Sequence, residues 1–196
     1  MRLLVGLGNP GAAYAGTRHN VGFMLAEAFL GRHGRGKARE EHGALVAPAR
    51  WAGEAILVAR PMGFMNLSGR PVAAICRAYD VLPSDLVVAY DDADLPLGSI
   101  RVRPSGRPSG HGGMASIIEA IGVMEIPRVR MGIGRPGEGD EELADYVLAR
   151  FAAEEGKQVE EMIARAADAV ELTLSRGVKI AMNHYNRRNK PGGPEA

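Results

Sequence analysis

The chain has 196 residues, of which 46% are hydrophobic and 24% charged, a composition typical of a globular protein with its own core. This length suits one domain. The single cysteine, Cys76, excludes an internal disulfide and favours a reducing compartment. No apolar run approaches the roughly 18–20 residues of a membrane span, and the opening MRLLVGLGNPG is too short and broken for a secretion signal. We therefore expect a cytoplasmic protein.

The net charge of +1 hides an uneven distribution of arginines. Between Leu95 and Arg135 there are six arginines and two glutamates, which gives +4 in this stretch and −3 in the rest of the chain. A local basic surface is what a phosphate-bearing partner needs. On charge alone, scattered and solvated arginines are the simpler interpretation.

The first half of the chain alternates apolar runs with helical patterns. Residues 2–8 predict a buried strand, residues 9–17 a loop and residues 20–30 a helix with one apolar face. The Gly- and charge-rich residues 31–41 predict a mobile connection. Two β-like runs, 44–50 and 54–60, flank Trp51-Ala52-Gly53 and predict a hairpin.

The second half continues this alternation. It predicts a helix after residues 66–68 with Pro71 in its first turn, and it then predicts strands at 85–90 and 99–103, a flexible loop at 104–113, a helix at 114–123, a strand at 128–134 and a long helix at 154–175. We predict one α/β domain over residues 1–188, with a twisted, mixed and mostly parallel β-sheet flanked by helices on both faces. Residues 189–196 predict a disordered tail.

The glycines after the first strand allow an alternative function. The string Gly6-Leu7-Gly8-Asn9-Pro10-Gly11 fits the G-x-G-x-x-G fingerprint of dinucleotide-binding sites. That site needs a helix to begin inside the motif, so that its amides meet the pyrophosphate. Pro10 and the residues after it predict a loop instead, and no acidic residue ends a second strand about 20 positions on. We therefore expect no nicotinamide or flavin cofactor.

Polar residues follow strands or precede helices at four separate places, namely Asn9, His19, Asn66 and Asp91. Taken singly, each has a structural explanation, because Asn and His often cap helices and Asp often forms turns. In open α/β sheets, however, ligands bind beyond the carboxyl ends of the strands, where these four residues would meet.

Their joint chemistry is more specific. An ordinary histidine can take a proton from water near neutral pH, and a carboxylate on its other nitrogen fixes the tautomer. Asparagine side chains can hold a carbonyl group or a water. The set therefore predicts hydrolysis of an activated carbonyl, with His19 as base and Asp91 as its support.

Other catalytic and metal-binding patterns are missing from the sequence. There is no G-x-S-x-G elbow for a serine nucleophile, no H-E-x-x-H and no Cys/His cluster with metal-ligand spacing. We therefore expect no metal, and we interpret Cys76 as a core residue. The remaining histidines, His33, His42, His111 and His184, are interpreted as surface or loop residues.

Several strings together resemble the bacterial peptidyl-tRNA hydrolase family. They run in order along the chain: VGLGNPG, Tyr14 with TRHNVG at 17–22, FMNLSG at 64–69, DDADLPLG at 91–98, RMGIGRPG at 130–137 and MNHYN at 182–186. The resemblance implies an esterase that releases tRNA from peptidyl-tRNA, as a monomer, without cofactor or metal. His19 would be the general base, Asp91 would hold its basic form, and Asn9 would distinguish blocked from free aminoacyl groups.

The resemblance also implies how the tRNA is bound. Asn66 would bind near the scissile ester, Tyr14 and Phe64 would contact the 3′ CCA end, and Arg103 and Arg130 would grip the 5′ phosphate of the acceptor stem. The chemistry of the four polar residues at the strand ends predicts the hydrolysis, whereas only the resemblance implies tRNA as the leaving group.

The chain departs from the family after its glycine-rich loop. Family members usually have GGHNGLKSI there, and we align this string with the residues from Gly112 onward. In that register Met114 and Ala115 stand where the family has His and Asn, so a tRNA contact is absent or comes from Ser116 or a loop arginine. A protein that binds tRNA or the ribosome without catalysis is therefore an alternative.

Overall fold

Seven strands form one sheet in the computed structural model, which describes residues 1–136 and 142–186. The strands are β1 (Arg2–Gly6), β2 (Arg39–Glu41), β3 (Ala44–Trp51), β4 (Glu54–Pro61), β5 (Leu86–Asp92), β6 (Ile100–Arg103) and β7 (Arg128–Gly132). Their order is β2-β3-β4-β1-β5-β7-β6. The central strands β4, β1, β5 and β7 run parallel, while β3 and β6 pair antiparallel with their neighbours.

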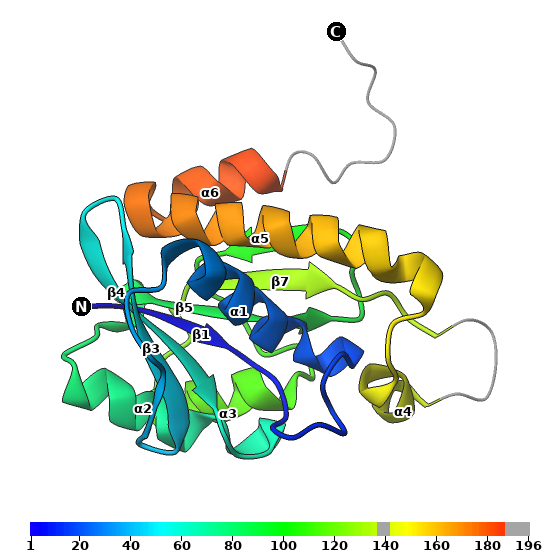
Figure 1. Ribbon diagram of the computed structural model, residues 1–196, viewed down its shortest axis with the longest axis horizontal. Coiled ribbons are helices and arrows are strands. Elements are labelled where there is room, and N and C mark those ends of the chain that lie inside the picture. The colour runs from blue at the N-terminus through cyan, green and yellow to red at the C-terminus, as the bar shows by residue number, and fades with distance from the viewer. Residues whose placement is uncertain (137–141, 187–196) are drawn as a thin grey trace, which may run out of the picture.

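Helices cover both faces of this sheet. They are α1 (Val21–His33), α2 (Gly69–Ala78), α3 (Gly112–Ile121), α4 (Leu143–Leu148), α5 (Gly156–Arg176) and α6 (Val178–Tyr185), with short 3-10 helices η1 (Arg18–Asn20), η2 (Met65–Leu67), η3 (Pro83–Asp85) and η4 (Ala153–Glu155). Figure 1 shows α1, α5 and α6 on one side of the sheet and α2 and α3 on the other. The predicted α/β fold class is confirmed. Within the described ranges, no helix combines the length and apolarity needed to cross a membrane.

The two faces of the sheet each carry a buried core. On β1, Leu3 and Val5 pack toward α2 and α3, while Leu4 packs toward α1 and α5. All three side chains are fully buried, as the alternation of side chains along a strand requires when both faces are covered. This explains why the central strands are apolar at nearly every position.

The predicted hairpin is confirmed, and its turn residues Ala52 and Gly53 both have positive φ, as a two-residue type I′ turn requires. The connection predicted at 31–41 is shorter in the structure and covers residues 34–38. Helix α1 continues to His33, and β2 pairs antiparallel with β3. The short helices α4 and α6 were not predicted. The predicted tail and the domain boundary at 188 lie outside the described residues.

Close packing of glycines places α1 against the ends of β1 and β5. A Cβ atom on Gly6 would lie 2.1 Å from the carbonyl oxygen of Gly22, and one on Gly22 would lie 2.4 Å from that of Ala89. The first helical turn after this motif is η1, at Arg18, so no helix begins inside the glycine motif. The glycines therefore serve close backbone approach, and this approach brings η1 to the carboxyl end of β5.

Candidate active site

The structure brings His19 and Asp91 together at the carboxyl end of β5. His19 Nδ1 lies 2.8 Å from Asp91 Oδ1 and 2.9 Å from Oδ2. Since a carboxylate only accepts, the proton of this hydrogen bond belongs to His19 Nδ1, and Nε2 is left as the basic nitrogen. Nε2 has no hydrogen-bond partner among the described residues, and the side chain lines a pocket of about 330 Å³.

Asp91 is an ionised acid in a buried position, with 4% of its surface exposed. Burial alone would raise the pKa of Asp91, but hydrogen bonds and electrostatic attraction from His111 and His19 hold it well below its ordinary value. The carboxylate is therefore charged at neutral pH, and it can stabilise a positive charge on His19.

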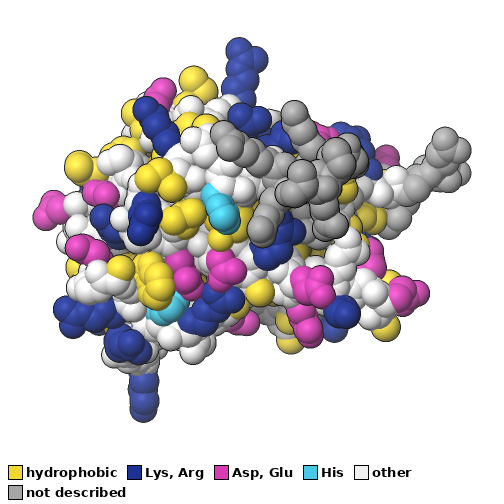
Figure 2. Space-filling view, turned by 90° about the horizontal axis from the view of Figure 1, so that it is seen from above, with side chains coloured by type: hydrophobic (Ala, Val, Ile, Leu, Met, Phe, Trp, Pro, Cys, Tyr) yellow, Lys and Arg dark blue, Asp and Glu magenta, His cyan; other side chains and the backbone are white. Residues whose placement is uncertain are grey.

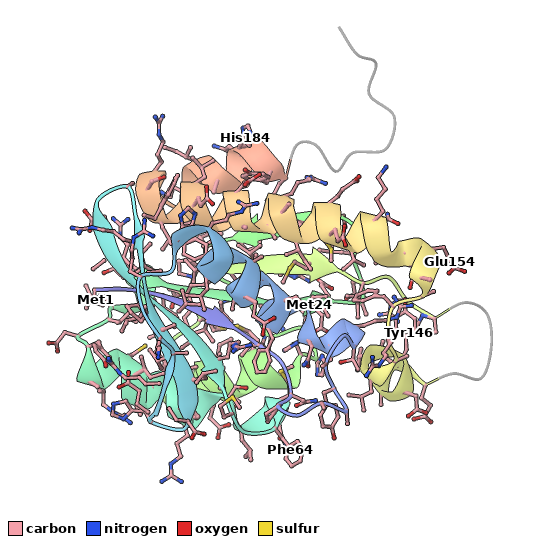
Figure 3. All side chains as sticks on the ribbon, viewed as in Figure 1. Met1, Met24, Phe64, Tyr146, Glu154 and His184 are labelled. Atoms are coloured by element: carbon pink, nitrogen blue, oxygen red, sulfur yellow. The ribbon has the colours of Figure 1, made fainter. Side chains whose placement is uncertain are left out.

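Arg18 anchors η1 to the segment that follows β7. Its guanidinium makes a two-pronged ion pair with Glu155, at 2.8 and 3.2 Å, and lies over the rings of Tyr146 (4.4 Å) and Phe151 (4.8 Å). Figure 3 places Tyr146 on this side of the molecule, by α4. A buried arginine held by charge and by two rings fixes the neighbouring residue, His19, in place.

Asn9 lies buried in the loop after β1, and its amide orientation is determined by its contacts. Its Oδ1 accepts a hydrogen bond from the backbone N–H of Met65 at 2.8 Å, so its Nδ2 is the group left to donate. The side chain of Asn20 bonds both the N–H and the carbonyl of Asn9, at 2.8 and 3.0 Å. Asn9 is thus a rigid donor that also holds η2 in place.

The other predicted substrate residues lie around this loop with their side chains partly or fully exposed. Asn66 is exposed on η2, next to the Met65 that Asn9 holds. Phe64 is 59% exposed and points away from the body of the molecule in Figure 3. Tyr14 lies half-buried in the loop before η1, and no contact ties its side chain to His19 or Asp91.

The two predicted phosphate-binding arginines line one pocket of about 250 Å³, together with Arg107 and Arg128. We call this the arginine pocket. It adjoins the pocket of His19, because Tyr90, Ser109 and Arg130 line both. The structure therefore brings Arg103 and Arg130 together, beside the predicted catalytic pair.

Only some of these arginines are free to meet a ligand. Arg130 makes an ion pair with Asp92 at 2.5 Å. Arg128 is 1% exposed, and its guanidinium bonds the carbonyls of Met124, Gly106 and Ile126, while burial lowers its pKa. Elsewhere charges of both signs are interspersed, as on the face shown in Figure 2. Only part of the basic stretch of the sequence therefore forms an exposed basic surface, and Arg103 and Arg107 are its main exposed residues.

Two histidines interpreted as surface or loop residues proved to be in contact with acids. His111 is the N-cap of α3, and its Nε2 lies 3.0 Å from Asp91 Oδ1. His33 bonds Glu171 at 2.8 Å and packs against Trp51. His111 is a loop residue, as predicted, but its side chain is buried at the site. His33 ends α1 with its side chain largely buried, so the interpretation was wrong for His33. His42 and His184 are exposed, as predicted.

The cluster of His19, Asp91 and His111 has the residue types of a metal site, with one donor atom of each within 4.8 Å of the others. A neutral imidazole that binds metal through Nε2 carries its proton on Nδ1. Nδ1 of His111 instead accepts the backbone N–H of Met114 at 3.2 Å. The cluster therefore fits a set of hydrogen bonds better than it fits a metal ion.

Comparison with known proteins identifies the family of the chain. The family model described as peptidyl-tRNA hydrolase matches residues 3–192. The chain belongs to the peptidyl-tRNA hydrolase family. The peptidyl-tRNA hydrolases of Symbiobacterium thermophilum and Nocardia farcinica are 44% and 46% identical to it, each over 94% of this chain and over 98% and 95% of their own lengths. A crystal structure of peptidyl-tRNA hydrolase from Acinetobacter baumannii superposes with a TM-score of 0.88 at 32% identity, covering 95% of this chain and 94% of that one. The protein is accordingly an enzyme, a hydrolase.

The position of His111 also revises the register of the family string GGHNGLKSI. Placed without a gap on residues 109–117 (SGHGGMASI), five of nine positions are identical, whereas the register starting at Gly112 leaves only the first two glycines. The family's His then falls on His111 and its Asn on Gly112. Ser116, suggested above as a substitute, is occupied: its hydroxyl accepts the N–H of Gly69 at 2.9 Å. This histidine could have been found from the string itself.

Proposed function

We propose that the enzyme hydrolyses the ester bond between the peptidyl group and the tRNA of peptidyl-tRNA, with His19 as general base. The observation that carries this proposal is the hydrogen bond from His19 Nδ1 to the buried Asp91, which leaves Nε2 basic at the pocket. Hydrolysis without a covalent intermediate needs a base, a water molecule and a substrate held in place. His19 can act as the base, and the amides of Asn9 and Asn66 can hold the substrate.

In the proposed reaction, a water bound near His19 gives a proton to Nε2 as its oxygen attacks the ester carbonyl. Asp91 stabilises the imidazolium that forms, as the carboxylate of a catalytic triad does. When the tetrahedral intermediate collapses, the ester C–O bond breaks and the imidazolium gives its proton to the departing ribose oxygen, which becomes a hydroxyl. The products are a free peptide acid and a free tRNA.

We assign to Asn9 the choice between blocked and free aminoacyl groups. Its Nδ2 can only donate a hydrogen bond, because Met65 occupies Oδ1. A donor suits the amide carbonyl of a peptidyl group and meets the ammonium of a free aminoacyl group as another donor. The exposed amide of Asn66, beside it, is proposed to hold the ester.

The tRNA is proposed to bind along the same edge of the sheet. Arg103 and Arg130 would meet the 5′ phosphate of the acceptor stem in the arginine pocket, and Tyr14 and Phe64 would pack against the 3′ CCA end. The exposed ring of Phe64 agrees with a stacking role. We further propose that the reaction runs in the cytoplasm, on a monomer, without metal or cofactor.

The test is turnover of an N-acetylated aminoacyl-tRNA by the purified protein, with the same aminoacyl-tRNA carrying a free amino group as control. We expect release of tRNA from the blocked substrate and at most slow release from the free one. Tight binding of both without turnover would instead identify a tRNA-binding protein that kept the fold.

A further inference from the structure

The arginine pocket contains one exposed arginine to which the proposed function gives no role. Four arginines line the pocket, namely Arg103, Arg107, Arg128 and Arg130. Arg130 is paired with Asp92, and the guanidinium of Arg128 bonds three backbone carbonyls. Arg103 and Arg107 are exposed, and among residues 1–136 and 142–186 neither side chain has an ion-pair or hydrogen-bond partner. The pocket therefore presents two unpaired positive charges, and one of them, on Arg107, has no assigned ligand.

Hydrogen bonds on either side of Arg107 hold its backbone at this pocket. The buried Arg128 donates from Nη1 to the carbonyl oxygen of Gly106 at 2.9 Å, and the N–H of His111 bonds the carbonyl of Pro108 at 3.0 Å. Since Arg128 belongs to β7, its bond ties the loop between β6 and α3 to the sheet. A residue whose backbone is already fixed loses less conformational freedom when it binds a ligand. The fold therefore presents Arg107 to the pocket.

The two unpaired charges match one kind of tRNA phosphate better than the other. A terminal phosphate monoester carries a charge of about −1.5 to −2 near neutral pH, whereas a phosphate inside the chain carries a single negative charge. The unpaired guanidinium groups of Arg103 and Arg107 line the same pocket of about 250 Å³, and no described acid lines it with them. Two positive charges in one small pocket therefore favour the doubly charged 5′ terminal phosphate.

We propose that Arg107 is a tRNA-binding residue: together with Arg103 it supplies the two charges that bind the 5′ terminal phosphate, while Arg130, neutralised by Asp92, contributes less. The inference rests on the proposed function, because that function makes tRNA the leaving group and brings its 5′ phosphate to this pocket. It also names the contact that offsets the polar side chain missing at Gly112, which has no side chain with which to bind tRNA.

Removal of the phosphate from the substrate tests this assignment. N-acetylated aminoacyl-tRNA is prepared from tRNA with a 5′ phosphate and from tRNA dephosphorylated before aminoacylation, and kcat and KM are measured for both. For the wild-type protein, KM should be about 10-fold higher without the phosphate, as the loss of two exposed ion pairs predicts. Arg107→Ala should raise KM about fivefold for the phosphorylated substrate only, with kcat unchanged. Arg107→Lys keeps the charge and should stay within about twofold of wild type.

Two further variants serve as comparisons. Arg77→Ala removes an exposed arginine in the last turn of α2 that lines neither pocket, and it should match wild type with both substrates. Arg130→Ala should raise KM for the phosphorylated substrate less than Arg107→Ala does, because Asp92 already neutralises Arg130. The proposal is overturned if Arg107→Ala leaves KM unchanged, if it raises KM equally for the two substrates, or if Arg130→Ala has the larger phosphate-dependent effect.

A second measurement does not depend on turnover. Binding of deacylated tRNA, with and without its 5′ phosphate, is measured by filter retention for wild type, Arg107→Ala and Arg77→Ala. Wild type and Arg77→Ala should prefer the phosphorylated tRNA, and Arg107→Ala should lose most of this preference. Phosphate-dependent binding without turnover would overturn the proposed function and leave the assignment of Arg107 standing. Turnover by a protein that binds both tRNAs equally would overturn the assignment of Arg107 alone.

Discussion

The pair His19–Asp91 and the arginine pocket adjoin one another, yet they are built in opposite ways. Asp91 is 4% exposed and its bonds to the histidines are short and enclosed, so dissolved salt barely screens them. Arg103 and Arg107 are exposed to solvent, where screening by salt is strong. From this difference we expect the proposed chemistry and the proposed tRNA binding to be separable: changes at the pair should appear in kcat, and changes at the arginines in KM and its salt dependence.

His19→Ala is the most direct test of whether the two regions are separable. Removing a general base costs roughly 10²–10⁴-fold, and we expect this loss in kcat for N-acetylated aminoacyl-tRNA. Binding of tRNA, measured by filter retention or fluorescence, should stay within about twofold of wild type because the arginine pocket is untouched. Near-normal turnover by this variant would remove His19 from the base role, and a loss of binding would show that the two regions are not separable.

Asp91→Asn should be the next largest change, lowering kcat by roughly 10²-fold because an amide no longer stabilises the imidazolium. The KM should change little. A kcat within a few-fold of wild type would mean that Asp91 is a structural acid.

The depressed pKa of Asp91 also predicts how stability depends on pH. An acid whose pKa is lower in the folded state stabilises the fold above its unfolded pKa, about 3.9, and loses that contribution as the pH falls through the folded value. The free energy of unfolding in urea should therefore fall more steeply below about pH 4 for wild type than for Asp91→Asn. Parallel curves would contradict the shift.

Much of this site was predictable from local patterns, and the failures have physical reasons. The sheet and its main helices follow from apolar periodicity, and the meeting of His19 with Asp91 follows from the rule that ligands bind at the carboxyl ends of parallel strands. Helix α4 has six residues and no buried one, so it offers too little periodicity to detect. Strand β2 is three mostly exposed residues, ordered by pairing with β3 rather than by its own composition.

The charge pattern of the sequence could not show which arginines are available to bind a ligand. Arg128 looks like any surface arginine in the sequence, but its partners are three backbone carbonyls that only the folded chain brings together. Arg130 meets Asp92 because β5 and β7 are neighbours in the sheet, a pairing that lies 38 positions apart in the chain. Local sequence therefore predicts a basic region but overstates its available charge.

Arg103→Ala and Arg130→Ala together test whether an unpaired arginine contributes more to tRNA binding than an arginine paired with an acid. Arg103 is exposed, so its loss should raise KM several-fold, with kcat unchanged, and reduce the slope of log KM against log salt by about 1. Arg130 shares its charge with Asp92, so its substitution should change the slope less. Steady-state kinetics between 50 and 200 mM salt measure both. Equal slopes in wild type and Arg103→Ala would remove Arg103 from the phosphate site.

A substitution at Gly112 tests the region between the His19–Asp91 pair and the arginine pocket, where we expect only a small change in KM. Gly112 stands where the family string has Asn, and a Cβ atom there would meet nothing closer than the Cβ of Asn66, at 3.9 Å. Gly112→Asn should therefore be accommodated and should place a new amide beside Asn66. One additional hydrogen bond is worth on the order of 1 kcal/mol, so KM for tRNA substrates should fall about fivefold while kcat stays constant. Gly112→Ala, which fills the same space without an amide, is the control and should leave KM unchanged. If both variants lowered KM equally, the gain would come from stiffening the start of α3, and the amide would have no part in holding the tRNA.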